Sequence, residues 1–239
     1  MELYIVTGAS RGLGRALVEN LLAHREVCVL ALSRAGVRGV DVWRDVRVDL
    51  GDDAGQDAAI EAIQDALGER EWTRTALINN AGMLEPIGIN GALDPGEVRT
   101  SIAVNLTAPI ALMNAFLSAS KVDGAVINIS SGSGRRPVAG SGVYCTAKAG
   151  LDMASRVAAL EVESQQRSIT ITALAPGIFE TDMQVVARSK TVEEFPAVEN
   201  FRAFKSQGLL KTPEEVAAKI VALDRARKLP AGIADLRDL

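Results

Sequence analysis

The chain has 239 residues, of which 48% are hydrophobic and 23% charged, and its net charge is −4 at pH 7. This balance is typical of a soluble globular protein, and without a basic patch it excludes nucleic acid and anionic membranes as expected partners. Two cysteines and one histidine, Cys28, Cys145 and His24, predict neither a disulfide framework nor a metal site. The first residues lack a basic segment followed by an apolar one, and no 18 consecutive residues are apolar. We therefore expect no signal peptide, no membrane span and a cytoplasmic location.

Short apolar segments alternate with longer helical patterns along most of the chain. Apolar strands that alternate with helices predict an α/β fold with a parallel sheet of about seven strands and helices on both faces. The late helix has Thr212 at its N-cap and Pro213 in its first turn. In chain order we predict a strand at 3–8, a helix at 14–25, strands at 26–34 and 43–50, a helix at 55–69, a strand at 74–82, a helix at 94–120, a strand at 124–134, a helix at 141–163, a strand at 168–177 and a helix at 212–227.

Residues 180–211 interrupt this alternation. The segment is polar and carries Phe195, Phe201 and Phe204. It follows the sixth strand, and ligands bind beyond the carboxyl ends of the strands in open α/β sheets. We interpret it as a substrate-side lid within a single domain, residues 1–239. The alternative is a surface excursion that packs its phenylalanines on the core.

The sequence "VTGASRGLG", residues 6–14, joins the first strand to the first helix. Its glycines allow backbone N–H groups to approach a pyrophosphate, and a helix N-terminus favours the negative charge. The order of strand, glycine turn and helix is the context in which such a motif binds a dinucleotide. The predicted cofactor-binding residues of the turn are Gly8, Ser10, Arg11, Gly12, Leu13 and Gly14.

Six motifs in the same order resemble the short-chain dehydrogenase/reductase family, near its sepiapterin reductase and benzil reductase branch. They span about three quarters of the chain, and their combination is far more specific than any one of them. The resemblance implies a doubly wound Rossmann-type domain that binds a nicotinamide cofactor. The motifs are "TGASRGLG" (7–14), "NNAG" (79–82), "VNLTAP" (104–109), "NISSGSG" (128–134), "YCTAK" (144–148) and "PGIFETDM" (176–183).

Reduction of a carbonyl needs an acid that protonates the oxygen and a group that orients it. Tyr144 and Lys148 are four residues apart on a predicted helix and so share one face. We predict Tyr144 as the general acid/base and Lys148 as the residue whose ammonium lowers the pKa of the phenol. Ser131 ends the fifth strand and should hold the substrate oxygen, with Ser133 close enough to assist. The resemblance implies that Lys148 also reaches the nicotinamide ribose and that Asn105 anchors a water in a proton relay; the alternative for Asn105 is a core amide with satisfied hydrogen bonds.

The second strand ends without the acidic residue that binds the ribose 2′-hydroxyl of NAD. Ser33 takes its place and Arg34 follows, while Arg11 projects from the glycine turn. Two guanidinium groups and no acid predict NADP(H) as the cofactor, since arginine binds a 2′-phosphate in a bidentate manner. The resemblance implies further contacts from Asp49 and Leu50 to adenine, from Asn80, Ala81 and Gly82 to the adenine ribose, and from Pro176, Gly177, Phe179 and Thr181 to the nicotinamide side.

The expected substrate is a flat or apolar ketone or diketone, because the predicted pocket lining is apolar. This lining comprises Met83, Leu84, Val138, Phe179 and Met183, and the resemblance adds Asp235 as a carboxylate near the C-terminus that could reach the substrate. Two alternatives stay open: a 3-oxoacyl-type reductase, with Arg135 and Arg136 facing an acidic carrier, and a non-catalytic NADP-binding sensor. The two long apolar helices predict a homodimer or homotetramer.

Overall fold

A seven-stranded, all-parallel sheet forms the centre of the molecule in a computed structural model that describes residues 1–239. The strand order is β3-β2-β1-β4-β5-β6-β7. The direction of winding reverses between β1 and β4, which is where ligands bind in sheets of this kind. The strands are β1 Glu2–Thr7, β2 Val27–Ser33, β3 Arg44–Arg47, β4 Arg74–Asn79, β5 Gly124–Ile129, β6 Ile169–Ala175 and β7 Gly232–Asp235.

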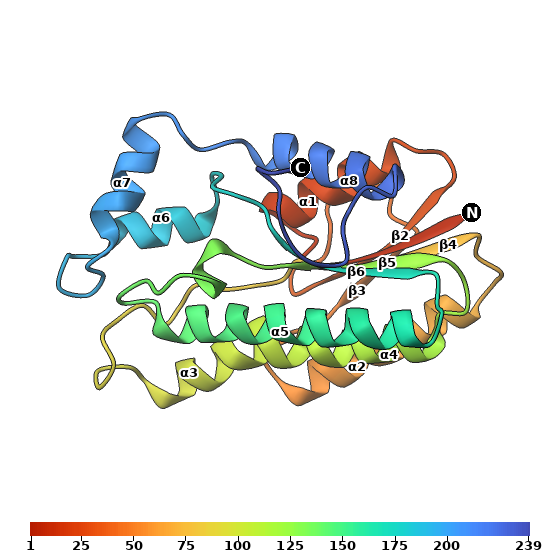
Figure 1. The fold of residues 1–239 in the computed structure, drawn as a ribbon, viewed down its shortest axis with the longest axis horizontal. Coiled ribbons are helices and arrows are strands. Elements are labelled where there is room, and N and C mark those ends of the chain that lie inside the picture. The colour runs from red at the N-terminus through yellow and green to blue at the C-terminus, as the bar shows by residue number, and fades with distance from the viewer.

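Helices cover both faces of the sheet, which confirms the predicted doubly wound Rossmann-type architecture (Figure 1). One core lies beneath α1 and α8, and the other lies beneath α2, α4 and α5. Strands β1, β2, β4 and β5 contribute buried side chains to both cores, which explains their near-continuous apolar sequences. The helices are α1 Gly12–Leu22, α2 Asp53–Gly68, α3 Pro95–Ile102, α4 Ala108–Ala119, α5 Gly142–Ser164, α6 Asp182–Ser189, α7 Val198–Ser206 and α8 Pro213–Arg225.

The predicted start of α8 is confirmed by its capping geometry. The Thr212 hydroxyl accepts a hydrogen bond from the Glu215 N–H at 3.2 Å, and the Glu215 carboxylate accepts one from the Thr212 N–H at 2.7 Å. This reciprocal pair satisfies two donors that the helix itself leaves without partners. Pro213, in the first turn, has no N–H to lose.

The long helix predicted at 94–120 is divided into α3, a π-helical turn Ala103–Thr107, and α4. The stretch Pro95–Ala119 is long and apolar enough to cross a membrane by length and composition alone, with a mean hydropathy of 1.6 over 18 residues, although no membrane span was expected from the sequence. Core helices of soluble proteins share this length and composition. Here Leu112 and Phe116 of α4 are fully buried against the sheet, as in a core helix.

Residues 180–211, the polar segment that interrupts the predicted alternation of strands and helices, form two helices, α6 and α7. Both lie beyond the end of the sheet at which the strands terminate (Figure 1). Phe195, between them, is fully buried in a separate small core with Leu84 and Val198. Tyr144 packs against that core. Phe201 packs against Phe195, so aromatic side chains anchor a segment that is otherwise polar.

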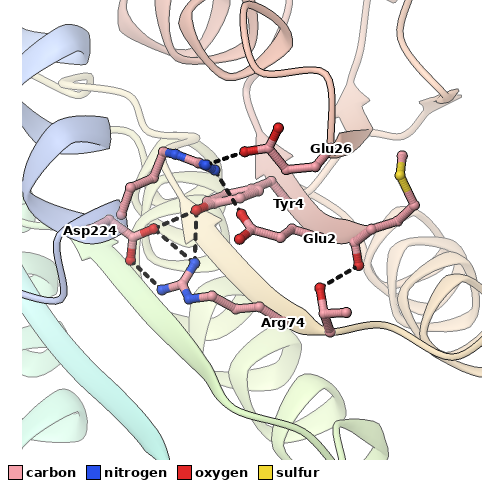
Figure 2. A network of polar contacts seen from close by, with 8 residues as sticks. Glu2, Tyr4, Glu26, Arg74 and Asp224 are labelled. Atoms are coloured by element: carbon pink, nitrogen blue, oxygen red, sulfur yellow. Dashed lines mark hydrogen bonds and ion pairs between the residues drawn. The ribbon is translucent and has the colours of Figure 1, made fainter.

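A buried polar network ties the opposite end of the sheet together (Figure 2). The Tyr4 hydroxyl donates to Asp224 at 2.8 Å and accepts from Arg74 at 2.8 Å. The Arg74 guanidinium also binds both Asp224 carboxylate oxygens, at 2.7 and 3.0 Å, and these two side chains are 9% and 3% exposed. Burial, reinforced by the Asp224 charge, raises the pKa of Tyr4. The network thus joins β1, β4 and α8 through residues far apart in the chain.

Asp224→Asn should lower the free energy of unfolding by about 3 kcal/mol, because it leaves the Arg74 charge buried without a counterion. Urea denaturation measures this change, provided that the free energies of unfolding of wild type and variant depend on urea concentration with the same slope. Glu26→Gln is the control, since the ion pair of Glu26 with Arg225 is exposed to solvent on the Glu26 side and should contribute much less to stability. Equal effects of the two substitutions would show that the buried network does not stabilise the fold as argued.

Candidate active site

The turn between β1 and α1 can be formed only by glycine at two of its positions. Gly8 has a φ of +67°, and a Cβ there would lie 2.9 Å from the Cα of Ala81. A Cβ on Gly14 would lie 2.1 Å from the carbonyl oxygen of Gly8. The first turn of α1 contains no acidic residue, and Arg11 at the N-cap position makes no side-chain capping bond. An open helix N-terminus beside a bare backbone turn fits a pyrophosphate.

The end of β4 is fastened to this turn by Thr7 and Asn80. The Thr7 hydroxyl accepts hydrogen bonds from the N–H groups of Asn80 and Ala81, both at 2.9 Å. The Asn80 amide donates to the Thr7 carbonyl at 2.9 Å and is 3.4 Å from the Gly8 carbonyl. The Asn80 side chain is therefore engaged in shaping the glycine turn. Thr7 was missed in the sequence, where a threonine closing an apolar strand directly before glycine was its only signal.

Beyond the end of β2, the arginines predicted to bind a phosphate differ in their surroundings. Arg34 is exposed and makes no ion pair, so its guanidinium is available to an anion. Arg11 forms an ion pair with Asp182 at the start of α6, but both side chains are about two thirds exposed. Ser33 is buried, and its hydroxyl accepts from the Gly36 N–H at 3.1 Å. Arg34 is thus the better placed of the two charges.

The two residues predicted to contact adenine, Asp49 and Leu50, lie just after β3. Asp49 is exposed and accepts a hydrogen bond from the Gly51 N–H at 2.9 Å, whereas Leu50 is buried. Their positions at the same edge of the sheet are compatible with the predicted contacts. A backbone carbonyl of Leu50 also accepts from Gln56 in α2 at 3.1 Å, which fixes the loop.

Tyr144, Lys148 and Ser131 come together where β5 ends and α5 begins. Lys148 lies one helical turn after Tyr144, with its Nζ 5.6 Å from the centre of the phenol ring. The Lys148 ammonium donates to the Ile129 carbonyl at 2.9 Å, which draws it to the end of β5. Ser131 follows that strand, and its side chain interacts with the phenol. The Ser133 N–H donates to the Ser131 hydroxyl at 3.1 Å and so orients it.

Burial dominates the acid–base properties of this cluster. It raises the pKa of Tyr144 to about 12, opposed by the interaction with Ser131. It lowers the pKa of Lys148 to about 8, opposed by the charge of Asp152. The pKa of Tyr144 is therefore raised, opposite to the direction expected from its lysine neighbour, because desolvation of the phenolate is the largest cause. A phenol that holds its proton at neutral pH is in the form that a general acid requires.

Asn105 lies in the π-helical turn and is completely buried. Its amide donates to the Met83 carbonyl at 2.8 Å and to the Ser101 hydroxyl at 3.2 Å, and its oxygen accepts from the Met83 N–H at 3.2 Å. These contacts use both amide protons and one lone pair of the amide oxygen, as in the core-amide alternative, and leave the second lone pair of that oxygen as an acceptor. A Cβ on Gly82 would lie 3.0 Å from the Asn105 oxygen and 3.8 Å from Lys148 Nζ. Asn105 and Lys148 thus converge on the same point, next to the catalytic cluster.

The predicted substrate residues do not all face one pocket. Leu84 is buried in the small core against which Val138, Met183 and Tyr144 pack, whereas Phe179 packs against the core beneath α1 and α8. Thr181 caps α6 by accepting from the Gln184 N–H at 3.2 Å, and Gly177, which follows Pro176, has a φ of +84°.

Asp235 ends β7 next to Ala175, so it lies at the carboxyl edge of the sheet. Both of its carboxylate oxygens accept hydrogen bonds from the Arg237 guanidinium, at 2.9 and 2.6 Å. Arg237 holds the pKa of Asp235 at about 2, well below its usual range. A substrate that used this carboxylate would have to displace Arg237 or bind beside it.

Residues 2–192 match the sequence model of the short chain dehydrogenase family. A benzil reductase ((S)-benzoin forming) of Bacillus subtilis (strain 168) is 33% identical over 93% of each chain. A sepiapterin reductase of Meriones unguiculatus is 35% identical over 92% of this chain and 89% of its own. The crystal structure of the KRED1-Pglu enzyme superposes with a TM-score of 0.81 at 26% identity, covering 98% of this chain and all of the other.

The chain therefore belongs to the short-chain dehydrogenase family and is an oxidoreductase. The resemblance inferred from its motifs is confirmed, including the benzil reductase and sepiapterin reductase branch.

Proposed function

We propose that this enzyme is an NADPH-dependent carbonyl reductase that acts on a flat or apolar ketone or diketone, in a single domain. The observation that carries the proposal is the convergence of Tyr144, Lys148 and Ser131 at the end of β5, beside the glycine turn. The names of the relatives, benzil reductase and sepiapterin reductase, support a carbonyl substrate. The apolar side chains of Leu84, Val138 and Met183 beside Tyr144 support an apolar one.

In this proposal the N–H groups at the start of α1 bind the pyrophosphate, and Arg34 binds the 2′-phosphate with help from Arg11. A bound nicotinamide supplies the hydride. Ser131 donates a hydrogen bond that orients the substrate oxygen, and the Tyr144 hydroxyl gives that oxygen its proton. Lys148 keeps a positive charge beside the phenol, and Asn105 anchors a water that returns a proton from solvent. Asp49, Leu50, Asn80, Ala81, Gly82, Pro176, Gly177, Phe179 and Thr181 complete the cofactor site.

The proposal is tested by NADPH oxidation against a panel of aryl diketones, simple ketones, pterin-like ketones and an acyl-carrier thioester. Turnover of the small ketones supports a carbonyl reductase, whereas turnover restricted to the thioester would indicate the 3-oxoacyl alternative. Arg135, one of the two charges suggested for an acidic carrier, is turned inward onto Asp152, which weakens that alternative. NADPH binding without turnover of any carbonyl would indicate a sensor.

Arg34→Ala should weaken NADPH binding by roughly 10- to 100-fold and leave NADH binding unchanged, because a charge-assisted bond to phosphate is worth about 1.5–3 kcal/mol. Fluorescence titration with both dinucleotides measures the two dissociation constants without turnover. Arg11→Ala should have a smaller effect, since Asp182 already pairs with Arg11. A wild-type protein with no NADPH preference would contradict the phosphate assignment.

We further propose a cytoplasmic homodimer or homotetramer in which α6 and α7 act as a lid over the substrate. The lid role is supported by Phe195, which belongs to the small core that contacts Tyr144, and by Met183, which packs against that core. Oligomerisation is supported by exposed apolar side chains at helical spacing on α5, Met153, Val157 and Leu160, with Ile110 on α4. Surface apolar patches of this kind mark subunit contacts in many proteins.

A further inference from the structure

Asp152 is a buried charge that the proposed chemistry does not use. It lies on α5 one helical turn after Lys148 and two turns after Tyr144, so the three side chains follow one face of the helix. Only 4% of the residue is exposed. A carboxylate so close to a catalytic lysine must have partners, because an isolated buried charge is prohibitively costly.

Two partners come from the segment that carries Ser131. The Ser130 hydroxyl donates to one Asp152 oxygen at 2.5 Å, and the Arg135 Nε donates to the other at 3.0 Å. Ser130 directly precedes Ser131 at the end of β5. Asp152 therefore holds the strand end at the residue next to the one that presents the Ser131 hydroxyl.

Arg135 extends this contact to the neighbouring strands. Its guanidinium donates to the Ala234 carbonyl at 3.1 Å and is 3.4 Å from the Ala173 carbonyl. The side chain is 27% exposed, so its charge is only partly screened by water. Ser130, Asp152 and Arg135 together form a support beneath the catalytic residues, anchored on β5, β6, β7 and α5.

The charged and titratable groups around Lys148 are few. On α5 they are Tyr144, the thiol of Cys145 and Asp152, and from the segment after β5 comes Arg135, bound to Asp152. The neighbouring strand end offers a backbone carbonyl and two serine hydroxyls, and the π-helical turn offers the neutral amide of Asn105. Asp152 is the one side chain whose charge favours the protonated lysine, against burial.

We propose that Asp152 is a positioning residue that supports the Lys148 ammonium electrostatically and fixes the strand end that presents Ser131, with Arg135 moderating its charge. This inference rests on the proposed function, in which Lys148 works as an ammonium beside Tyr144. It assigns a role to a residue outside the set that contacts substrate or cofactor.

The test is the pH profile of kcat/KM for a ketone at saturating NADPH. Loss of the lysine proton should set the alkaline limb, so Asp152→Asn should move that limb about one pH unit lower, as removal of a neighbouring opposite charge does. Asp152→Glu retains the charge and should bring the limb back toward that of the wild type. Arg135→Gln should move the limb the opposite way, to higher pH, because the carboxylate is then less neutralised. Glu161→Gln, an exposed carboxylate of the same helix, should leave the profile unchanged.

A second measurement does not depend on turnover. Nuclear magnetic resonance titration of ¹³C-labelled lysines, with the Lys148 signal assigned by Lys148→Arg, follows the protonation of Lys148 itself. A wild-type protein that reduces no ketone would overturn the proposed function, whereas the titration would still test Asp152. An unchanged Lys148 titration in folded Asp152→Asn would overturn the inference. If Asp152→Asn does not fold, Arg135→Gln provides the test. A Lys148 titration in Arg135→Gln that is unchanged or moved to lower pH would then overturn the inference.

Discussion

Tyr144→Phe is expected to reduce kcat/KM for ketone reduction by roughly 10³- to 10⁴-fold, the upper part of the range for loss of a general acid. The substitution removes only the hydroxyl, and the ring keeps its packing against the small core of Leu84 and Phe195. NADPH binding, measured by fluorescence titration, should therefore change little. The effect should appear in kcat, because the lost proton transfer occurs in the transition state.

Tyr4→Phe is the matched control, since Tyr4 is the only other tyrosine of the chain and its side chain is fully buried. It lies at the opposite end of the sheet from the catalytic residues, in the network with Arg74 and Asp224. We expect it to lower stability and to leave kcat close to the wild-type value. Wild-type turnover by Tyr144→Phe would mean that another group, such as Ser131, donates the proton.

The sheet could be predicted from sequence because its strands are buried on both faces. β1, β2, β4, β5 and β6 are short, mainly apolar segments that are buried along nearly their whole length. β7 could not be placed, although about seven strands were expected. Its residues Gly232–Asp235 are mostly half-exposed or exposed, and only pairing with β6 makes them a strand.

The departures from the predicted helices have tertiary causes. The π-helical turn depends on where Asn105 must point to pair with the Met83 backbone, which no local sequence pattern encodes. α6 and α7 depend on the burial of Phe195 against Leu84, a residue more than a hundred positions earlier. Helix propensity in a polar segment is too weak to reveal such long-range contacts.

In the site, residue spacing in the sequence predicts which side chains lie together, whereas their pKa values and ion pairs depend on the folded surroundings. Four-residue spacing places Tyr144 and Lys148 on one face of a helix, and this geometry holds in the structure. The direction of the Tyr144 pKa shift could not be predicted, because it depends on how much water reaches the phenol. The engagement of Arg135 with Asp152 likewise appears only when separate segments meet, whereas Asp235 and Arg237 pair within a single local turn.

Lys148→Met is expected to abolish most activity and, at neutral pH, to stabilise the fold. Burial lowers the pKa of Lys148 from 10.5 to about 8, so below pH 8 the folded protein bears the cost of a buried ammonium. A difference of this size corresponds to about 3 kcal/mol. Loss of the hydrogen bond to the Ile129 carbonyl offsets about 1 kcal/mol, which leaves a net gain of about 2 kcal/mol at pH 7.

The stability difference between Lys148→Met and the wild type should depend on pH. Between pH 8 and 10.5 the unfolded chain holds a proton on Lys148 that the folded protein has released, so the wild-type protein gains stability from this residue as the pH rises. The advantage of Lys148→Met over wild type should therefore shrink between pH 7 and pH 10. Urea unfolding at several pH values measures this difference in stability, and Lys121→Met, at an exposed lysine, should show no such trend.

A Lys148→Met variant less stable than the wild type at pH 7 would mean that the contacts of the ammonium outweigh the cost of its burial. If Lys148→Met stabilises the fold and also lowers turnover by roughly 10³-fold, the lysine costs stability and contributes to catalysis. Its role is then to place a positive charge beside Tyr144.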